Sequence, residues 1–249
     1  GRPATQLSLL ADARLSAGVC ITRQRLRFIL TDLSGRELGY KDVRHQKDVS
    51  DPDYSAFLAA QLERFLDENG VDRGQLLGVG VSLAGVISAE SRSILFAPTL
   101  ALRDVPFSQL LQAIPYPTRL ESDGSSGGVG EWFCAPGTRN IAFLSIEDGV
   151  GGSVLVNGAQ FTGDNGRSGE FGHMCVEPGG LPCKCGRRGC HGGVFHQGDH
   201  IRRCEHRQGA GADSGRGIFR RHDGGSGTDG ANGNGHWKSL LYYVCGPPA

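Results

Sequence analysis

The sequence contains no run of apolar residues long enough to cross a bilayer, and its first residues show no signal-peptide pattern. We therefore expect a cytoplasmic protein with no membrane partner. It also lacks net charge: 26 Lys and Arg balance 26 Asp and Glu, so the chain as a whole has no field to hold DNA, although a local basic patch is compatible with that balance. At 249 residues the chain can form one large domain or two lobes.

Cysteine is too sparse and too unevenly spaced for a disulfide scaffold, with eight residues in a chain of this length. Three of them, Cys183, Cys185 and Cys190, lie close together, and His173 precedes them. Three thiolates and one imidazole satisfy a tetrahedral zinc ion without leaving an open position. The spacing therefore predicts a zinc site made by these four residues. A set of free thiols beside a surface histidine is the alternative.

Alternating apolar residues and turn signals predict an antiparallel meander near the start of the chain, followed by a helix and a buried strand. The helix is expected to open at Asp51-Pro52-Asp53, whose acids would cap it, and to end at Asn69-Gly70. A short second helix is expected from Phe107 to Ala113. The predicted strands run from Leu15 to Ile21, Arg25 to Leu33, Leu38 to Val43, Leu77 to Val81, Thr118 to Glu121, Ile141 to Ile146 and Ser153 to Asn157. This order is typical of an α/β protein.

The residues around the predicted zinc site resemble the signature of the ROK family, which comprises repressors, open reading frames and kinases. The resemblance is carried by Gly169-Glu170-Phe171-Gly172-His173 and by Cys183-Lys184-Cys185-Gly186-Arg187-Arg188-Gly189-Cys190. It implies a two-lobed α/β ATPase fold, actin-like and hexokinase-like, with ribonuclease H-like lobes, of which the second is incomplete here. It also implies that the zinc is structural, and that His173 binds it through one ring nitrogen while the other nitrogen faces a sugar hydroxyl.

The resemblance further implies a set of sugar ligands. Glu170 corresponds to the sugar-binding glutamate of the family, and Asp123 to the aspartate that acts as catalytic base in its kinases. Ser122 stands where those kinases have Asn, and Gly85 matches a glycine turn that touches the sugar. His173 completes the predicted ligand-binding set. Without the resemblance, an isolated loop Asp or Glu is usually a solvated surface residue.

Two loops that hold ATP phosphates in ROK kinases are altered in this sequence. The first should read Asp-x-Gly-Gly-Thr, but the matching stretch is Cys20-Ile21-Thr22-Arg23-Gln24, which lacks the acid and both glycines. The second is Glu147-Asp148-Gly149-Val150-Gly151-Gly152, which keeps most glycines but places two carboxylates beside the phosphate position. Because carboxylates repel a polyphosphate, the sequence argues against the use of ATP and Mg²⁺.

The transcriptional-regulator branch of the family, with its xylose- and N-acetylglucosamine-repressor-like members, fits these departures better. Gly1-Arg2-Pro3 resembles the linker that joins a winged helix-turn-helix to the sugar-sensing domain of such regulators. We therefore expect a sugar-sensing effector domain rather than an enzyme, with DNA bound only through a module missing from this chain. A glucokinase-like ROK sugar kinase is the alternative. Family members commonly pair, so the intact protein is expected to be a homodimer.

The last part of the sequence departs from the family. From His191 onward about a quarter of the residues are Gly and no apolar periodicity is visible, so a low-complexity, disordered tail is expected. Gly192 stands where the family has another sugar-binding Glu. We hypothesise a one-base frameshift near Cys190, which would leave a nonfunctional product. A natural disordered tail is the alternative.

These observations divide the chain into four parts. They are a linker over residues 1–12, an N-terminal α/β lobe over 13–120, a partial C-terminal lobe with the zinc loop over 121–190, and the tail over 191–249. Metal binding by the tail is a third interpretation of that segment, through His196, His200 and His206.

Overall fold

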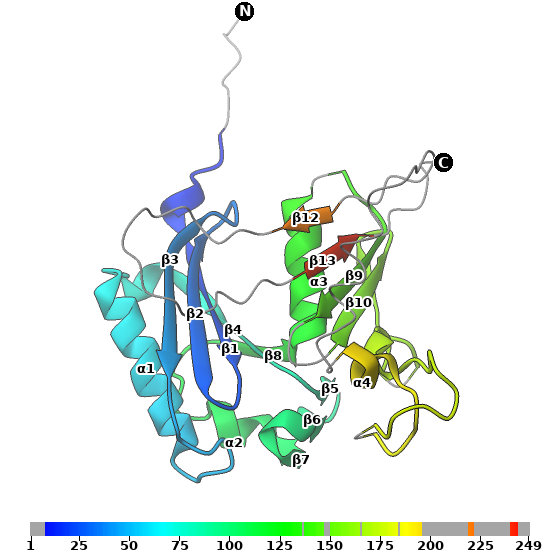
Figure 1. Ribbon diagram of the computed structural model, residues 1–249. Helices are drawn as coiled ribbons and strands as arrows, with labels where there is room; N and C mark the ends of the chain where they lie inside the picture. The colour runs from blue at the N-terminus through cyan, green and yellow to red at the C-terminus, as the bar shows by residue number, and fades with distance from the viewer. Residues whose placement is uncertain are drawn as a thin grey trace, which may run out of the picture. The chain divides into compact units, whose positions relative to one another are not determined.

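A computed structural model of the chain describes residues 8–135, 137–146, 150–164, 166–183 and 185–195, together with the backbone of Phe219–Arg221 and Leu240–Tyr243. The chain forms two compact units, Gly1–Ser122 and Asp123–Ala249 (Figure 1). Within the described residues, no helix is both long enough and apolar enough to span a membrane.

The first unit is built on a five-stranded mixed sheet. Its strands are β1 (Leu15–Ile21), β2 (Arg25–Asp32), β3 (Glu37–Arg44), β4 (Leu76–Leu83) and β8 (Thr118–Ser122). They lie in the order β3-β2-β1-β4-β8. The pairs β1–β2 and β2–β3 are antiparallel, which confirms the predicted meander, whereas β4 runs parallel to β1 and β8 parallel to β4.

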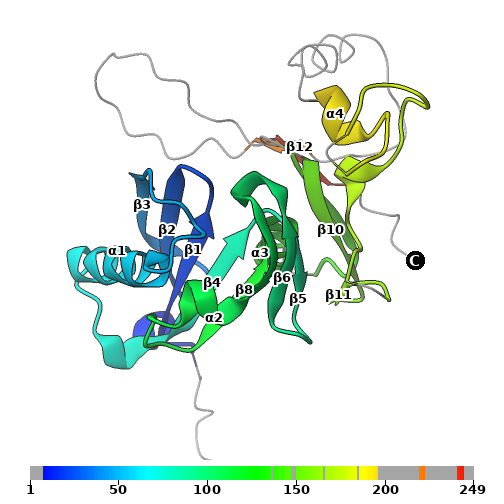
Figure 2. The same cartoon turned by 90° about the horizontal axis from the view of Figure 1, so that it is seen from below.

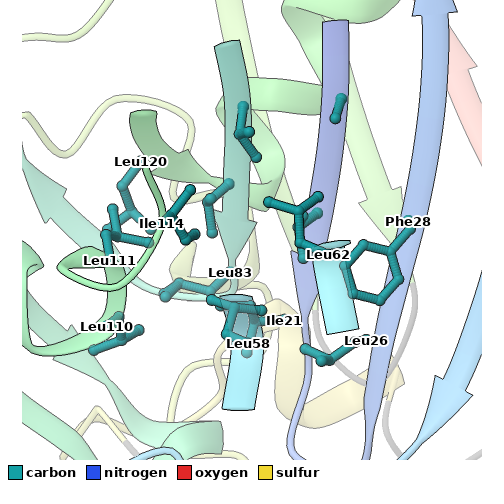
Figure 3. Close-up of a cluster of buried hydrophobic side chains, with 14 of the residues drawn as sticks. Ile21, Leu26, Phe28, Leu58, Leu62, Leu83, Leu110, Leu111, Ile114 and Leu120 are labelled. Carbon is teal, nitrogen blue, oxygen red and sulfur yellow. The ribbon is translucent and has the colours of Figure 1, made fainter. Parts of the chain in front are cut away.

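Helix α1 (Tyr54–Glu68) packs on one face of this sheet (Figures 1 and 2). Every second residue of β1 is buried, as expected for a strand with one face toward a core. Leu58 and Leu62 of the helix lie among these side chains, close to Ile21 and Phe28 of the sheet (Figure 3). The helical spacing of its apolar residues therefore predicts the buried face of α1 correctly.

The C-terminal end of α1 agrees with the prediction, whereas the N-terminal cap does not. Asn69 is the C-cap residue and Gly70 adopts a left-handed φ of 63°, as the Asn-Gly pair indicates. The predicted acidic cap is wrong. Asp53 occupies the N-cap position, but its side chain makes no capping bond, and no acid lies in the first turn. Instead, the Asp53 carboxylate accepts a hydrogen bond from Lys47 Nζ at 2.6 Å.

A second, three-stranded antiparallel sheet of the first unit is absent from the prediction. It consists of β5 (Val86–Ser88), β6 (Ser93–Ala97) and β7 (Leu102–Pro106), and helix α2 (Phe107–Leu111) follows it. Non-glycine residues take the left-handed conformations of this region, namely Arg92, Ala101 and Asp104. The usual glycine signals of tight turns are therefore missing from the sequence here. Short 3-10 helices complete the unit at Ala11–Ala13, Arg73–Gln75 and Pro98–Leu100.

The second unit contains another five-stranded sheet, in which all pairs are antiparallel. Its strands, in the order β11-β10-β9-β13-β12, are β9 (Ile141–Ile146), β10 (Val150–Val156), β11 (Ala159–Phe161), β12 (Phe219–Arg221) and β13 (Leu240–Tyr243). Helix α3 (Asp123–Cys134) packs against β9 and β10 (Figure 1). A small core forms there from Ile141, Phe143 and Leu155, with Trp132 of α3 against it.

Helix α3 is the largest element that the sequence does not predict. Four glycines within it, Gly124, Gly127, Gly128 and Gly130, conceal it, because glycine disfavours a helix interior. Two of them allow the helix to lie close to the sheet. A Cβ at Gly127 would lie 2.5 Å from the Phe143 ring, and one at Gly128 would lie 1.9 Å from Ser153 Oγ. Packing against the sheet thus overrides helix propensity.

Regular structure also occurs after residue 190, where the sequence predicts none. Helix α4 (His191–Phe195) follows directly, and the backbone of β13 pairs with β9. These residues and β12 have regular backbone structure, and the expectation of a disordered tail for the segment as a whole stays a prediction. The remainder of the segment, including His196, His200 and His206, lies outside the described residues.

Candidate metal and ligand site

Close backbone contacts at glycines bring three segments of the second unit together. A Cβ at Gly124, in the first turn of α3, would lie 2.6 Å from the backbone nitrogen of Gly152 in β10. A Cβ at Gly169 would lie 2.3 Å from the Gly152 carbonyl oxygen, and one at Gly172 would lie 2.1 Å from the Val150 carbonyl oxygen. Side chains at these positions would therefore separate the segments. The glycines hold the start of α3 and the 3-10 helix η4 (Phe171–His173) against the same strand.

The four predicted metal ligands converge. One ligand atom from each of His173, Cys183, Cys185 and Cys190 lies within 4.8 Å of the others. The His173 Nδ1 atom is 3.5 Å from Cys183 Sγ, and the Sγ atoms of Cys185 and Cys190 are 3.6 Å apart. These residues come from η4, from the loop after it and from the residue before α4, so they are distant in sequence but adjacent in space. The cluster can hold a metal ion.

A glycine-hinged loop positions the cysteines. Isolated antiparallel bridges pair Cys175 with Cys190 and Pro182 with Arg188, so the segment folds back on itself. At its tip, the Cys183 nitrogen donates to the Arg187 carbonyl oxygen at 2.8 Å. Positive φ angles occur at Gly179, Gly186 and Gly189. These conformations favour glycine, which explains the glycine-rich spacing between the cysteines.

The thiols of the loop have different environments. The backbone N–H of Arg187 lowers the pKa of Cys185 to about 6, whereas burial raises the pKa of Cys190 to about 11. Arg187 also anchors the loop to η4, because its guanidinium donates to the His173 carbonyl oxygen at 2.9 Å. In the sequence Arg187 is only one member of the motif that resembles the ROK signature, and its hydrogen bond to His173 follows from the fold of the loop.

The second ring nitrogen of His173 faces Glu170. His173 Nε2 lies 4.0 Å from a carboxylate oxygen of Glu170, and the two side chains are 38% and 41% exposed. Partial burial raises the pKa of Glu170, the charge of His173 opposes that shift, and the nearby carboxylate of Asp123 adds to it. Asp123 itself begins α3 and accepts a hydrogen bond from the Gly124 nitrogen at 2.8 Å. Three predicted ligand residues are thus neighbours within one unit.

The other two predicted ligand residues, Gly85 and Ser122, belong to the first unit. Ser122 is the last residue of β8. Gly85 lies between β4 and β5, where a Cβ would be 2.7 Å from the Phe96 carbonyl oxygen. Packing within this unit already requires glycine at that position. The role of both residues in ligand binding stays a prediction.

Comparison with known proteins identifies the family. The sequence model of the ROK family matches residues 16–225. The chain belongs to the ROK family. The xylose repressor of Bacillus subtilis (strain 168) is 30% identical over 193 residues, which are 76% of this chain and 50% of the repressor. A glucokinase of Halalkalibacterium halodurans is 31% identical over 137 residues, which are 53% of this chain and 42% of the kinase.

Solved structures of ROK proteins share the fold. The crystal structure of a ROK family transcriptional regulator, a homolog of the E. coli MLC protein, superimposes with a TM-score of 0.67 at 22% identity, covering 84% of this chain and 54% of that chain. The predicted hexokinase-like ATPase fold is thereby confirmed. The chain spans about half the length of the xylose repressors it matches. Both repressors and glucokinases are among the relatives that match this chain.

Proposed function

We propose that this chain is the sugar-binding effector domain of a ROK-type transcriptional regulator, with a structural zinc ion beside the sugar. One observation carries the proposal: the two nitrogens of His173 face different partners. Nδ1 faces the cysteine cluster and Nε2 faces Glu170. A metal that holds one nitrogen fixes the orientation and tautomer of the ring, so the other nitrogen is presented to a ligand in one direction.

The distances within the cluster support zinc. Zinc–sulfur bonds of about 2.3 Å and zinc–nitrogen bonds of about 2.0–2.1 Å place two thiolates of a tetrahedron about 3.8 Å apart, and a thiolate and an imidazole nitrogen about 3.6 Å apart. The corresponding separations here are 3.6 Å for Cys185 and Cys190 and 3.5 Å for Cys183 and His173. Four such ligands leave no open position, so the ion would supply rigidity to the loop and no chemistry on the sugar.

The carboxylates beside His173 suit a polyol. A carboxylate accepts hydrogen bonds from neighbouring hydroxyls, and an imidazole nitrogen either donates or accepts one. The neighbours of Asp123 and Glu170 in the chain, Gly124 and Gly169, both pack against Gly152, and the charge of Asp123 helps to raise the pKa of Glu170. The hydroxyls of a bound sugar would separate these two like charges and satisfy both. Gly85 and Ser122 complete the proposed ligand set on the resemblance alone.

The first hairpin of the chain supports a regulator over a kinase. At the turn after β1, the Thr22 nitrogen donates to the Arg25 carbonyl oxygen at 2.9 Å, and the Arg25 nitrogen donates to Thr22 Oγ1 at 3.1 Å. These N–H groups are used within the turn and are not presented to a phosphate. Residues 147–149 of the second predicted phosphate loop lie outside the described residues. In the whole protein, sugar binding would be transmitted to DNA by a helix-turn-helix module in a homodimer.

Titration calorimetry of the purified chain tests sugar binding, with xylose, glucose and N-acetylglucosamine as probes. Glu170→Gln removes a charge-assisted hydrogen bond, and we expect it to weaken binding roughly ten- to hundred-fold. Glu90→Gln, at an exposed position of the first unit, is the matched control and should leave the affinity unchanged. Absence of binding to every sugar, or equal affinity of both variants, would overturn the proposal.

A ROK sugar kinase is the second candidate, because Asp123 and Glu170 belong to the same unit and glucokinases are among the relatives. In that case Asp123 would accept the proton of the attacked hydroxyl. Coupled measurement of ADP release with the same sugars separates the two functions. Turnover that Asp123→Asn abolishes would favour the kinase.

Gly192 bears on the affinity of the chain. A Cβ at this position would lie 3.2 Å from the carbonyl oxygen of Gly172, the neighbour of His173. A carboxylate expected here from the family is missing, which predicts weak sugar binding.

The proposed frameshift is tested by sequencing the locus. If the shifted reading frame does not encode apolar helices after Cys190, the frameshift is wrong.

A further inference from the structure

A fourth cysteine, Cys175, borders the three-cysteine, one-histidine cluster without belonging to it. Cys175 lies two residues after His173 and is exposed, whereas Cys190 is 1% exposed. The ligand group comprises His173, Cys183, Cys185 and Cys190. The Cys175 thiol instead donates weakly to the Arg188 carbonyl oxygen, with a sulfur–oxygen distance of 3.7 Å. Nothing in the proposed function uses this thiol.

The backbone places Cys175 directly opposite Cys190. The two residues form an antiparallel bridge. The flanking hydrogen bonds run from the Val176 nitrogen to the Gly189 carbonyl oxygen at 2.9 Å and from the His191 nitrogen to the Met174 carbonyl oxygen at 2.8 Å. Because both bonds lie outside the pair, Cys175 and Cys190 are a non-hydrogen-bonded pair, the kind in which facing side chains approach most closely.

This geometry suits a disulfide. Cα atoms of a non-hydrogen-bonded antiparallel pair lie about 4.5 Å apart, within the range of roughly 4.4–6.8 Å in which two cysteines can be bridged. Directly opposed side chains also leave the ladder on the same face, so a rotation about χ1 is sufficient to turn the Cys175 sulfur from the Arg188 carbonyl toward Cys190.

We infer that Cys175 and Cys190 are an oxidisable thiol pair, and that their disulfide removes Cys190 from the metal cluster. The inference rests on the proposed metal site for its consequence, but the thiol pair itself depends only on the register of the two segments. Cys190 has one sulfur, which cannot both be bound in a disulfide and serve as a thiolate ligand. The oxidised chain therefore retains three of the four ligands and holds zinc less tightly.

The chemistry balances with a hydroperoxide as oxidant. The Cys175 thiolate attacks one peroxide oxygen, the O–O bond breaks, and Cys175 becomes a sulfenic acid while the peroxide leaves as water or an alcohol. The Cys190 thiolate then attacks the Cys175 sulfur, the S–S bond forms, and the hydroxyl group leaves as water after protonation. In total, two thiols lose two electrons and two protons. Cys175 reacts first because it is exposed and outside the ligand group.

The test uses the full, zinc-loaded chain treated with hydrogen peroxide. Zinc release is followed with a chromogenic chelator, and disulfides are mapped by mass spectrometry after alkylation of free thiols. Trypsin leaves Cys175 and Cys183 on one peptide and Cys190 on another, so fragmentation at Pro178 or Pro182 decides which of the first two is bonded to Cys190. We expect the Cys175–Cys190 bond to appear together with zinc release.

Two variants make the test specific. Cys175→Ser keeps all four ligands and should slow peroxide-driven zinc release by about tenfold or more. Cys134→Ser, at another exposed cysteine, is the matched control and should release zinc like the unmodified sequence. A disulfide between Cys185 and Cys190, with equal release from Cys175→Ser, would overturn the inference while the metal site stands.

The failure of the metal site gives a different result. A chain that contains no zinc after purification, yet forms the Cys175–Cys190 bond in peroxide, would refute the metal site and support the thiol pair. A zinc-free chain in which this bond is also missing would refute both.

Discussion

His173 Nε2 lies 4.0 Å from the Glu170 carboxylate, while the other ring nitrogen, Nδ1, lies 3.5 Å from Cys183 Sγ. One imidazole therefore connects the cysteine cluster to the proposed ligand site. The rigidity of the loop and the recognition of the sugar depend on the same side chain, but through different atoms. That separation allows the two roles to be tested independently.

Replacement of His173 by cysteine is the most direct test of this division. His173→Cys supplies a fourth thiolate, so we expect the chain to keep one zinc ion, but it removes the nitrogen that faces Glu170. Zinc content is measured by atomic emission and sugar affinity by calorimetry. A variant that keeps both zinc and undiminished sugar affinity would show that Nε2 has no part in ligand binding.

Removal of a thiolate ligand should cause the loss of zinc that the replacement of His173 by cysteine avoids. Cys183→Ser leaves three ligands, and we expect loss of zinc together with a lower melting temperature, because binding of a structural metal contributes to folding free energy. The same lowering is expected when a chelator is added to the unmodified chain. Cys134→Ser serves as control, since its thiol is exposed and outside the cluster. A melting temperature that does not change when a chelator is added would contradict the metal site.

The glycines of α3 give a prediction about packing. Gly128→Ala places a methyl group 1.9 Å from Ser153 Oγ, and we expect it to lower the free energy of unfolding by about 1–3 kcal/mol through overpacking. Gly130→Ala is the matched control in the same helix. Among the described residues, no heavy atom outside the adjoining backbone of α3 lies within 4 Å of its added Cβ, so the higher helix propensity of alanine should stabilise the chain by about 0.5–1 kcal/mol. Denaturant unfolding of both variants measures the difference. If Gly128→Ala is the more stable of the two, the close approach of α3 to β10 is wrong.

Asp32 gives a prediction about acid stability. Hydrogen bonds from the Ser34 hydroxyl, with those from the Ser34 and Arg36 nitrogens, hold the pKa of its carboxyl below the usual value. Its contribution to stability is therefore complete above the unfolded-state pKa of about 3.9 and is lost as pH falls through the lower, folded-state value.

Asp32→Asn should consequently be less stable than the unmodified chain at neutral pH, and the difference should shrink as the pH is lowered below about 4. Unfolding free energies of both proteins over this pH range provide the measurement. A difference that stays constant down to the acid limit would show that the charge of Asp32 does not matter.

The sequence by itself determined the strands with clear alternation and the identity of the four residues that can hold a metal ion. The limits of β1 and β9 agree with the predicted Leu15–Ile21 and Ile141–Ile146, because apolar periodicity reports directly which side chains face a core. His173 and the three clustered cysteines were also found from residue type and spacing, since few other constellations suit three thiolates and an imidazole.

Only the tertiary structure decided where local rules are overridden by distant contacts. Helix α3 forms in spite of its glycines, because a helix without side chains on one face fits closely against β9 and β10. Lys47 takes the Asp53 carboxylate away from the helix cap. The pairing of Cys175 with Cys190 and the assignment of the two His173 nitrogens depend on how separate segments meet in space, and no pattern along the chain specifies that meeting.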